Sequence, residues 1–149
     1  MQQLVYSMHF RGSATPLEGA TPGMAVKAIA VSCSITSIVN KGGLTGGFDP
    51  SAVTNAVFES EVSLLTSATF TERGTIAFGD AGHRLHFAST DEGWMGQSAD
   101  PALKQGTVSW TVEGGEGQFD GAGGLITSNF TVNEAGEVND YHMGVIYLR

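Results

Sequence analysis

The residues of this sequence that could carry out chemistry include two tyrosines, each set in a run of alternating residues. Tyr6 lies in the run 4–11 and Tyr141 in the run 138–148. Successive side chains of a strand point to opposite faces, so each hydroxyl would share a face with apolar neighbours. A phenol in such an apolar wall can donate a hydrogen bond to a bound molecule. We predict that Tyr6 or Tyr141 supplies a catalytic hydrogen bond.

The remaining reactive side chains lack partners at the spacings that known chemistries need. His83 and His86 are three residues apart in a strand-like segment, so they would face opposite sides and could not share a metal ion. Cys33 is the only cysteine and has no histidine near it in the sequence, and no G-x-S-x-G turn occurs. The other two histidines, His9 and His142, are isolated. We therefore expect no metal site, no nucleophilic enzyme and no cofactor.

Two carboxylates, Glu59 and Glu61, share one face of the segment 56–71. If that face is outside, both are simply solvated. If it is inside, one would have a raised pKa and could act as an acid or a base. The opposite face carries Phe58, Val62 and Leu64, which favours the solvated alternative.

Length and charge limit the classes of function. The chain has 149 residues, with 7 Lys and Arg against 15 Asp and Glu, so its formal charge is −8. This length suits a single domain spanning 1–149 with a core of its own. The negative charge repels phosphate groups, so neither nucleic acid nor an anionic membrane is an expected partner. One cysteine, no secretory leader and no membrane-length apolar run predict a cytoplasmic protein.

Alternation with a period of two predicts an all-β fold. Apolar residues alternate with polar or small residues in eight segments: 4–11, 28–36, 56–71, 75–78, 84–89, 107–113, 125–132 and 138–148. The long connections 12–25, 41–55 and 90–105 are rich in Gly, Pro, Ser or Asp and are predicted to be rim loops, with one helical turn at 50–53 after Asp49. Closure removes exposed sheet edges, so we predict an eight-stranded antiparallel closed barrel, with an open β-sandwich as the alternative.

A glycine-rich stretch, 113–124, separates the sixth and seventh segments. A phosphate-binding loop would need a helix after the glycines and no nearby carboxylates, whereas a strand-like segment follows here and Glu113, Glu116 and Asp120 lie among them. The glycines are better explained as a sharp bend that needs positive φ angles, with Phe119 closing one end of the barrel.

The stretch Gly114-Gly115-Glu116-Gly117-Gln118-Phe119-Asp120-Gly121-Ala122-Gly123-Gly124 resembles the GGTGxFxGAxG motif of allene oxide cyclase-like and dirigent-like barrel proteins. The resemblance covers mainly this stretch and implies an eight-stranded barrel, allene oxide cyclase-like or calycin-like, often trimeric. It also implies an apolar lumen that steers a reactive hydrophobic substrate toward one cyclised or coupled product. In those families the motif is structural, and no catalytic constellation of either family is found in this sequence.

The apolar faces of the strands are predicted to point inward and to bound a lumen for a small hydrophobic molecule. Besides the two tyrosines, the ligand-binding wall would contain six residues: Met8, Phe87, Trp110, Phe130, Met143 and Tyr147. Three functions fit this pattern: an isomerase or cyclase-like enzyme, a non-catalytic lipophile-binding barrel, and a structural barrel with a filled lumen. Four apolar residues predicted to face outward, Val5, Leu125, Ile146 and Leu148, together with the resemblance, suggest a homo-oligomer, either a trimer or a dimer.

Overall fold

A computed structural model describes residues 1–19, 21–32, 35–48, 55–79 and 82–149 of the chain, and most of them lie in strands. One sheet contains nine strands: β1 (Gln2–Pro16), β2 (Gly23–Ser32), β5 (Ala56–Leu64), β6 (Thr69–Phe78), β7 (Arg84–Ser89), β8 (Gly93–Gln97), β9 (Lys104–Glu116), β10 (Gly123–Val132) and β11 (Glu137–Leu148). A separate two-stranded ribbon consists of β3 (Ile35–Asn40) and β4 (Gly43–Phe48).

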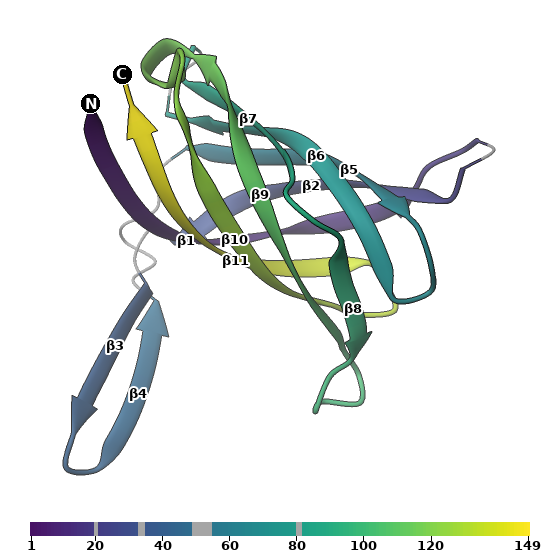
Figure 1. The fold of residues 1–149 in the computed structure, drawn as a ribbon. Helices are drawn as coiled ribbons and strands as arrows, with labels where there is room; N and C mark the ends of the chain where they lie inside the picture. Colours follow the sequence, from purple (N-terminus) through teal and green to yellow (C-terminus); the bar gives the residue numbers. More distant parts are fainter. Residues whose placement is uncertain (20, 33–34, 49–54, 80–81) are drawn as a thin grey trace.

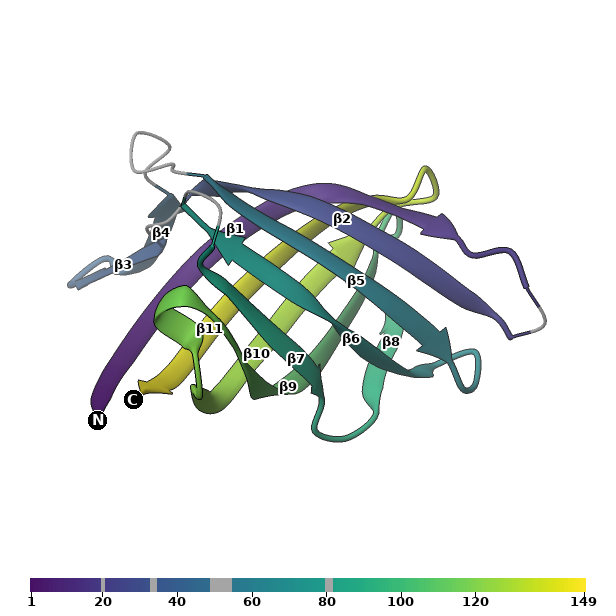
Figure 2. The same cartoon turned by 90° about the horizontal axis from the view of Figure 1, so that it is seen from above.

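The large sheet closes on itself as an antiparallel barrel (Figures 1 and 2). Its strand order is β10-β11-β1-β2-β5-β6-β7-β9, and pairing of β9 with β10 completes the ring. The short β8 pairs with the same two strands as β7, which are β6 and β9, but it pairs with a different part of each. Since β7 and β8 share one position in the ring, the barrel has eight strand positions, which confirms the predicted fold.

The two ends of the barrel differ. The end that carries both chain termini also carries the 3₁₀ turn Gly117–Phe119 (Figure 2), and we call it the closed end. Phe119 is 1% exposed and packs against Phe78, as the sequence predicts. Gly117 and Gly121 have φ angles of 64°, which other residues rarely adopt, so the glycines permit the turn. The opposite end, with the connections 98–103 and 133–136, is the open end.

Aromatic side chains fill the middle of the barrel. Trp110 is fully buried, with its ring centroid 4.3 Å from that of Phe87 and 5.4 Å from that of Phe58. Phe10 packs against Phe58 from the other side. This layer separates the closed end from the open end.

The structure corrects the predicted orientation of β11. Tyr141, Met143 and Tyr147 were expected inside, but Met143 and Tyr147 are 55% and 42% exposed, and Tyr141 stacks on the outer-face residue His9. The inward face instead carries Val138, Asp140, His142, Gly144, Ile146 and Leu148. Ile146 and Leu148 were therefore also wrongly predicted to face outward.

Local packing explains this orientation. Gly144 leaves space for the ring of Tyr6, which lies where a β-carbon of residue 144 would be. Asp140 and His142 lie next to each other inside, so each offsets part of the cost of burying the other. On the outside, His9, Tyr141 and Phe48 of β4 pack against one another, with centroid distances from His9 of 4.7 Å to Tyr141 and 4.9 Å to Phe48.

Several predicted boundaries also differ. The segment 56–71 is broken into β5 and β6 by a turn in which the Thr66 hydroxyl accepts hydrogen bonds from the backbone of Ala68 and Thr69. Parts of the predicted loops 12–25, 41–55 and 90–105 are strands, among them the whole of β4 and β8. Cys33 and the predicted helical turn 50–53 lie outside the described residues.

Candidate functional site

The open end of the barrel contains a cavity of about 990 Å³. Its walls are mostly apolar, and its rim is formed by the connections between β8 and β9 and between β10 and β11. The wall residues from the strands include Met24, Val62, Leu64, Phe70, Met95, Phe130 and Val138. Two carboxylic acids, Glu72 and Asp140, also line it. We call this cavity the open-end pocket; its size and lining are those of a site for a small organic molecule.

Glu72 is a buried acid held by two hydrogen bonds. It follows Phe70 and precedes Ile76 on the inward face of β6, and it is 8% exposed. Ser60 Oγ donates to Glu72 Oε1 at 2.6 Å, and Trp110 Nε1 donates to Oε2 at 3.2 Å. Burial, with a smaller contribution from the charge of Asp140, raises the pKa of Glu72 to about 8, although the two hydrogen bonds oppose this shift. At neutral pH this carboxyl therefore holds a proton.

Asp140 has a different set of neighbours. Ser128 Oγ donates to Asp140 Oδ1 at 2.5 Å, and His142 Nε2 lies 2.9 Å from Oδ2. The His142 contact has the length of an ion pair but not the alignment of a hydrogen bond, and neither ring nitrogen has a hydrogen-bond partner among the described residues. Asp140 is 5% exposed. The pocket thus presents two carboxylic acids in unlike surroundings, an arrangement that can give and accept protons.

The residues predicted to form the site are distributed over three regions. Tyr6, Met8, Phe87, Trp110 and Phe130 lie inside the barrel or pack against its core, as predicted, but of these only Phe130 lines the open-end pocket. The Tyr6 hydroxyl is buried with no hydrogen-bond partner in the described structure, and burial, together with the charge of Asp140, raises its pKa above the usual range. The remaining three, Tyr141, Met143 and Tyr147, lie outside.

Sequence reasoning missed the two acids of the pocket. Glu72 falls between the predicted segments 56–71 and 75–78 and was assigned to neither. The spacing could have identified it, because Glu72 lies two residues after Phe70 and four before Ile76. In a strand this places the acid on the same inward face as those two apolar residues. Asp140 and His142 were predicted to face outward, because the opposite face of the segment 138–148 is more apolar. Glu59 and Glu61 are exposed, as predicted.

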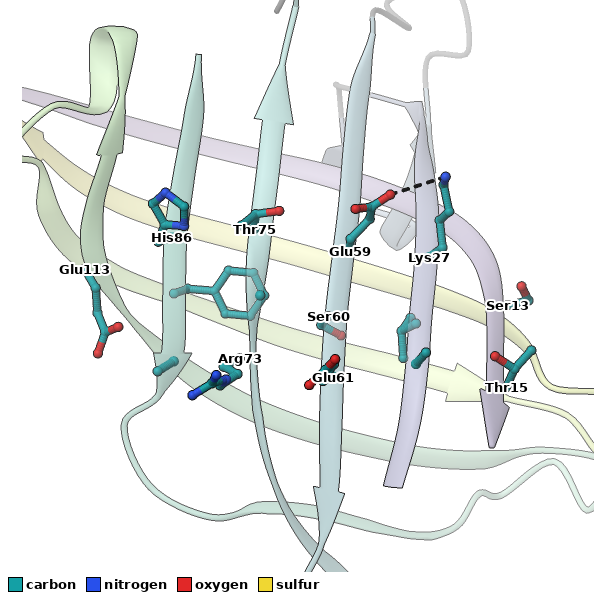
Figure 3. A pocket seen from close by; sticks show the side chains of 15 residues that line it. Ser13, Thr15, Lys27, Glu59, Ser60, Glu61, Arg73, Thr75, His86 and Glu113 are labelled. Carbon is teal, nitrogen blue, oxygen red and sulfur yellow. Dashed lines mark ion pairs between the residues drawn. The ribbon is translucent and has the colours of Figure 1, made fainter. Parts of the chain in front are cut away.

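A second cavity, of about 810 Å³, lies on the outside of the barrel (Figure 3). Polar side chains of neighbouring strands line it, including Arg73, Glu61 and His86. Lys27 Nζ and Glu59 Oε1 form an ion pair of 3.3 Å there, but both side chains are more than half exposed, so the pair is weak. Among the described residues that line this outer cavity, no acidic or basic side chain is buried, so the cavity is a less suitable site for chemistry.

The described residues offer neither a metal-binding cluster nor a membrane-spanning helix. Among the described residues, no three or more His, Cys, Asp and Glu side chains cluster in a way that could hold a metal ion. The same part of the chain contains no helix with the length and apolar character needed to span a membrane.

One solved structure with a similar fold is that of a pterocarpan synthase dirigent protein. The match has a TM-score of 0.57 at 11% sequence identity, and it covers 99% of this chain and 90% of that chain. This likeness confirms the dirigent-like barrel that the glycine-rich stretch suggested, as a statement about fold. No protein-family model matches the sequence, and no curated protein does.

Proposed function

From a dirigent-like barrel with an apolar pocket, we propose an isomerase or cyclase-like enzyme that acts on a small hydrophobic molecule by proton transfer. The observation that supports it most is the placement of two carboxylic acids, Glu72 and Asp140, in the wall of that pocket. The raised pKa of Glu72 makes it the acid. Asp140 is the base, because a carboxylate beside a protonated partner can accept a proton.

The proposed step conserves atoms and charge. In a cyclisation, a hydroxyl of the substrate adds to an electron-poor carbon of the same molecule and gives its proton to Asp140. Glu72 gives its proton to the substrate atom that gains the displaced electron pair. In an isomerisation, Asp140 takes a proton from a carbon next to a carbonyl and Glu72 protonates the carbonyl oxygen, and the reverse transfers place the double bond or the hydrogen elsewhere.

The fold likeness is consistent with this proposal, since the similar structure belongs to a protein described as a synthase. A second candidate, a non-catalytic lipophile-binding barrel, is favoured by the apolar wall of Val62, Leu64, Phe70 and Phe130, which could hold a ligand without chemistry. The third alternative, a structural barrel with a filled lumen, fits only the aromatic middle and the closed end of the molecule, because the open end contains the pocket. In this proposal Glu72 takes the catalytic role that was predicted for Tyr6 or Tyr141, because neither tyrosine lines the open-end pocket.

Binding is tested with the neutral fluorescent probe N-phenyl-1-naphthylamine. Val62 faces the pocket, whereas its neighbour Ser63 is exposed on the outer face of the same strand. We expect Val62→Trp to fill the pocket and weaken probe binding by roughly tenfold or more, while Ser63→Trp leaves it unchanged. Equal binding by both variants would place the probe outside the pocket and remove the basis of the proposal.

Catalysis is tested with 2-tetralone, a neutral bicyclic ketone with acidic hydrogens next to its carbonyl. Mass spectrometry in heavy water measures how fast those hydrogens exchange for deuterium. We expect the wild type to accelerate exchange, and Glu72→Gln to lose roughly 10²- to 10⁴-fold of that acceleration while still binding the probe. The control is Glu61→Gln, an exposed acid on β5. Probe binding without accelerated exchange in the wild type would favour the non-catalytic barrel.

A further inference from the structure

The interior of the barrel has an unbalanced set of ionisable groups. All seven Lys and Arg side chains lie among the described residues, and every one of them is exposed. Two carboxylic acids, Glu72 and Asp140, are buried inside. Within the described part of the chain, His142 is the one basic side chain in the interior, since His9 is on the outer face and His83 and His86 are at least partly exposed.

The surroundings of His142 suit a positive charge. Its side chain is fully buried, and three aromatic rings surround it: Phe10 at 4.5 Å, Trp110 at 5.0 Å and Phe58 at 5.3 Å between ring centroids. Aromatic faces attract cations, and the attraction is stronger where water is excluded. The 2.9 Å contact with Asp140 does not have the alignment of a hydrogen bond, but attraction between opposite charges does not need that alignment. An imidazolium costs more to bury than a neutral ring does, and its 2.9 Å contact with the Asp140 carboxylate is the interaction that offsets this cost.

We propose that His142 is a positioning residue, held as an imidazolium between the aromatic rings and Asp140, so that Asp140 stays ionised and acts as the base beside protonated Glu72. This inference rests on the proposed proton transfer. With a neutral Glu72, a negative Asp140 and a positive His142, the described part of the interior carries no net charge. Among the described residues, the titratable groups that accompany His142 in the interior are Asp140 on its own strand, Glu72 on β6 and Tyr6 on β1, and Tyr6 stays neutral because burial keeps its proton in place.

The protonation state of His142 can be observed directly by nitrogen-15 NMR on histidine-labelled protein without ligand. The signal is assigned by its disappearance in His142→Phe, a substitution that keeps a ring among the three aromatic side chains. We expect both ring nitrogens of His142 to give imidazolium shifts at neutral pH. Asp140→Asn removes the negative partner and should shift the signals to those of a neutral ring, whereas Ser128→Ala, which removes one hydrogen bond to Asp140 but leaves its carboxylate, should leave them as imidazolium.

A second measurement covers the case in which Asp140→Asn does not fold. In His142→Phe the lost positive charge should cause Asp140 to take up a proton, seen as a carbon-13 shift of its carboxyl at neutral pH, and 2-tetralone exchange should fall by roughly tenfold or more. A neutral His142 in the wild type, or an Asp140 carboxyl unchanged in His142→Phe, would overturn the inference. The NMR signals are recorded without substrate. A protein that does not accelerate 2-tetralone exchange but has an imidazolium at His142 would therefore refute only the enzyme proposal and not the charge state of His142.

Discussion

Glu72 couples the stability of the barrel to pH through one buried carboxyl. Its pKa is 4.5 in an ordinary setting and about 8 in the folded protein, where burial is the main cause. Between these values the folded state holds a proton that the unfolded chain has released. The stability that comes from the neutral form is therefore complete below about pH 4.5 and is lost as the pH rises toward about 8.

We expect Glu72→Gln to flatten this dependence, because an amide stays neutral at every pH and keeps the oxygen that accepts the hydrogen bond from Ser60. The free energy of unfolding of the wild type, relative to the variant, should fall by about 1.4 kcal/mol for each pH unit in this range. Urea denaturation at a series of pH values measures it. Glu61→Gln, which changes an exposed acid, should run parallel to the wild type, and a parallel course for Glu72→Gln as well would contradict the buried-acid assignment.

Among the structural elements, the turn 117–119 closes one end of the barrel and is separate from the pocket at the other end. Phe119 packs against Phe78 at a centroid distance of 5.4 Å and does not line the open-end pocket. Stability and ligand binding should therefore depend on different ends of the molecule. The glycines around Phe119 have a structural role, which agrees with the interpretation made from the sequence.

We expect Phe119→Ala to lower the free energy of unfolding by about 3–5 kcal/mol, because it leaves a cavity where a buried ring was. Probe affinity measured well below the unfolding transition should stay within about twofold, since the aromatic layer separates the two ends. Gln118→Ala, at an exposed neighbouring position, should change neither quantity. A large loss of probe binding in Phe119→Ala at full folding would show that the two ends are coupled.

At the scale of the whole molecule, an uncharged apolar stripe runs across the outer faces of β1, β11 and β10. Val5 is paired with Val145, and Val145 with Leu125, so the three form a row, with Met143 and Tyr147 flanking it on β11. Val5, Leu125, Met143 and Tyr147 are 57%, 46%, 55% and 42% exposed. Copies of a chain with a charge of −8 repel one another, and an apolar face without charges adds least to that repulsion, so this stripe is one surface that suits self-association.

We propose that copies of the chain associate through this stripe, as a dimer or a trimer. Sedimentation velocity at micromolar concentration should show a species larger than the monomer. Met143→Glu places a charge in the middle of the stripe and should shift the protein to monomer, because a buried unpaired charge is costly. The matched substitution Ser63→Glu lies on the outer face of β5 and should leave the assembly intact. A wild type that sediments as a monomer would refute the proposal.

Much of this fold could be predicted from the sequence, because alternation is a local property. It located the barrel strands, and the glycine-rich stretch with Phe119 indicated both a closed end and the kind of barrel. Alternation does not say which of two faces is inside. On β11 the more apolar face, with Tyr141 and Met143, is outside, since the inward position depends on neighbours that are distant in sequence, such as Tyr6 beside Gly144.

The candidate site was decided by tertiary structure alone. Glu72, Ser60 and Trp110 come from three strands, and Asp140 and Ser128 from two others. Burying an acid is unfavourable unless partners meet it, and no spacing along the chain shows that they will. The sequence by itself determined where most of the barrel strands are and favoured a closed barrel over an open sandwich. Only the closed ring, by bringing those strands face to face, determined which polar side chains are inside and what they can do.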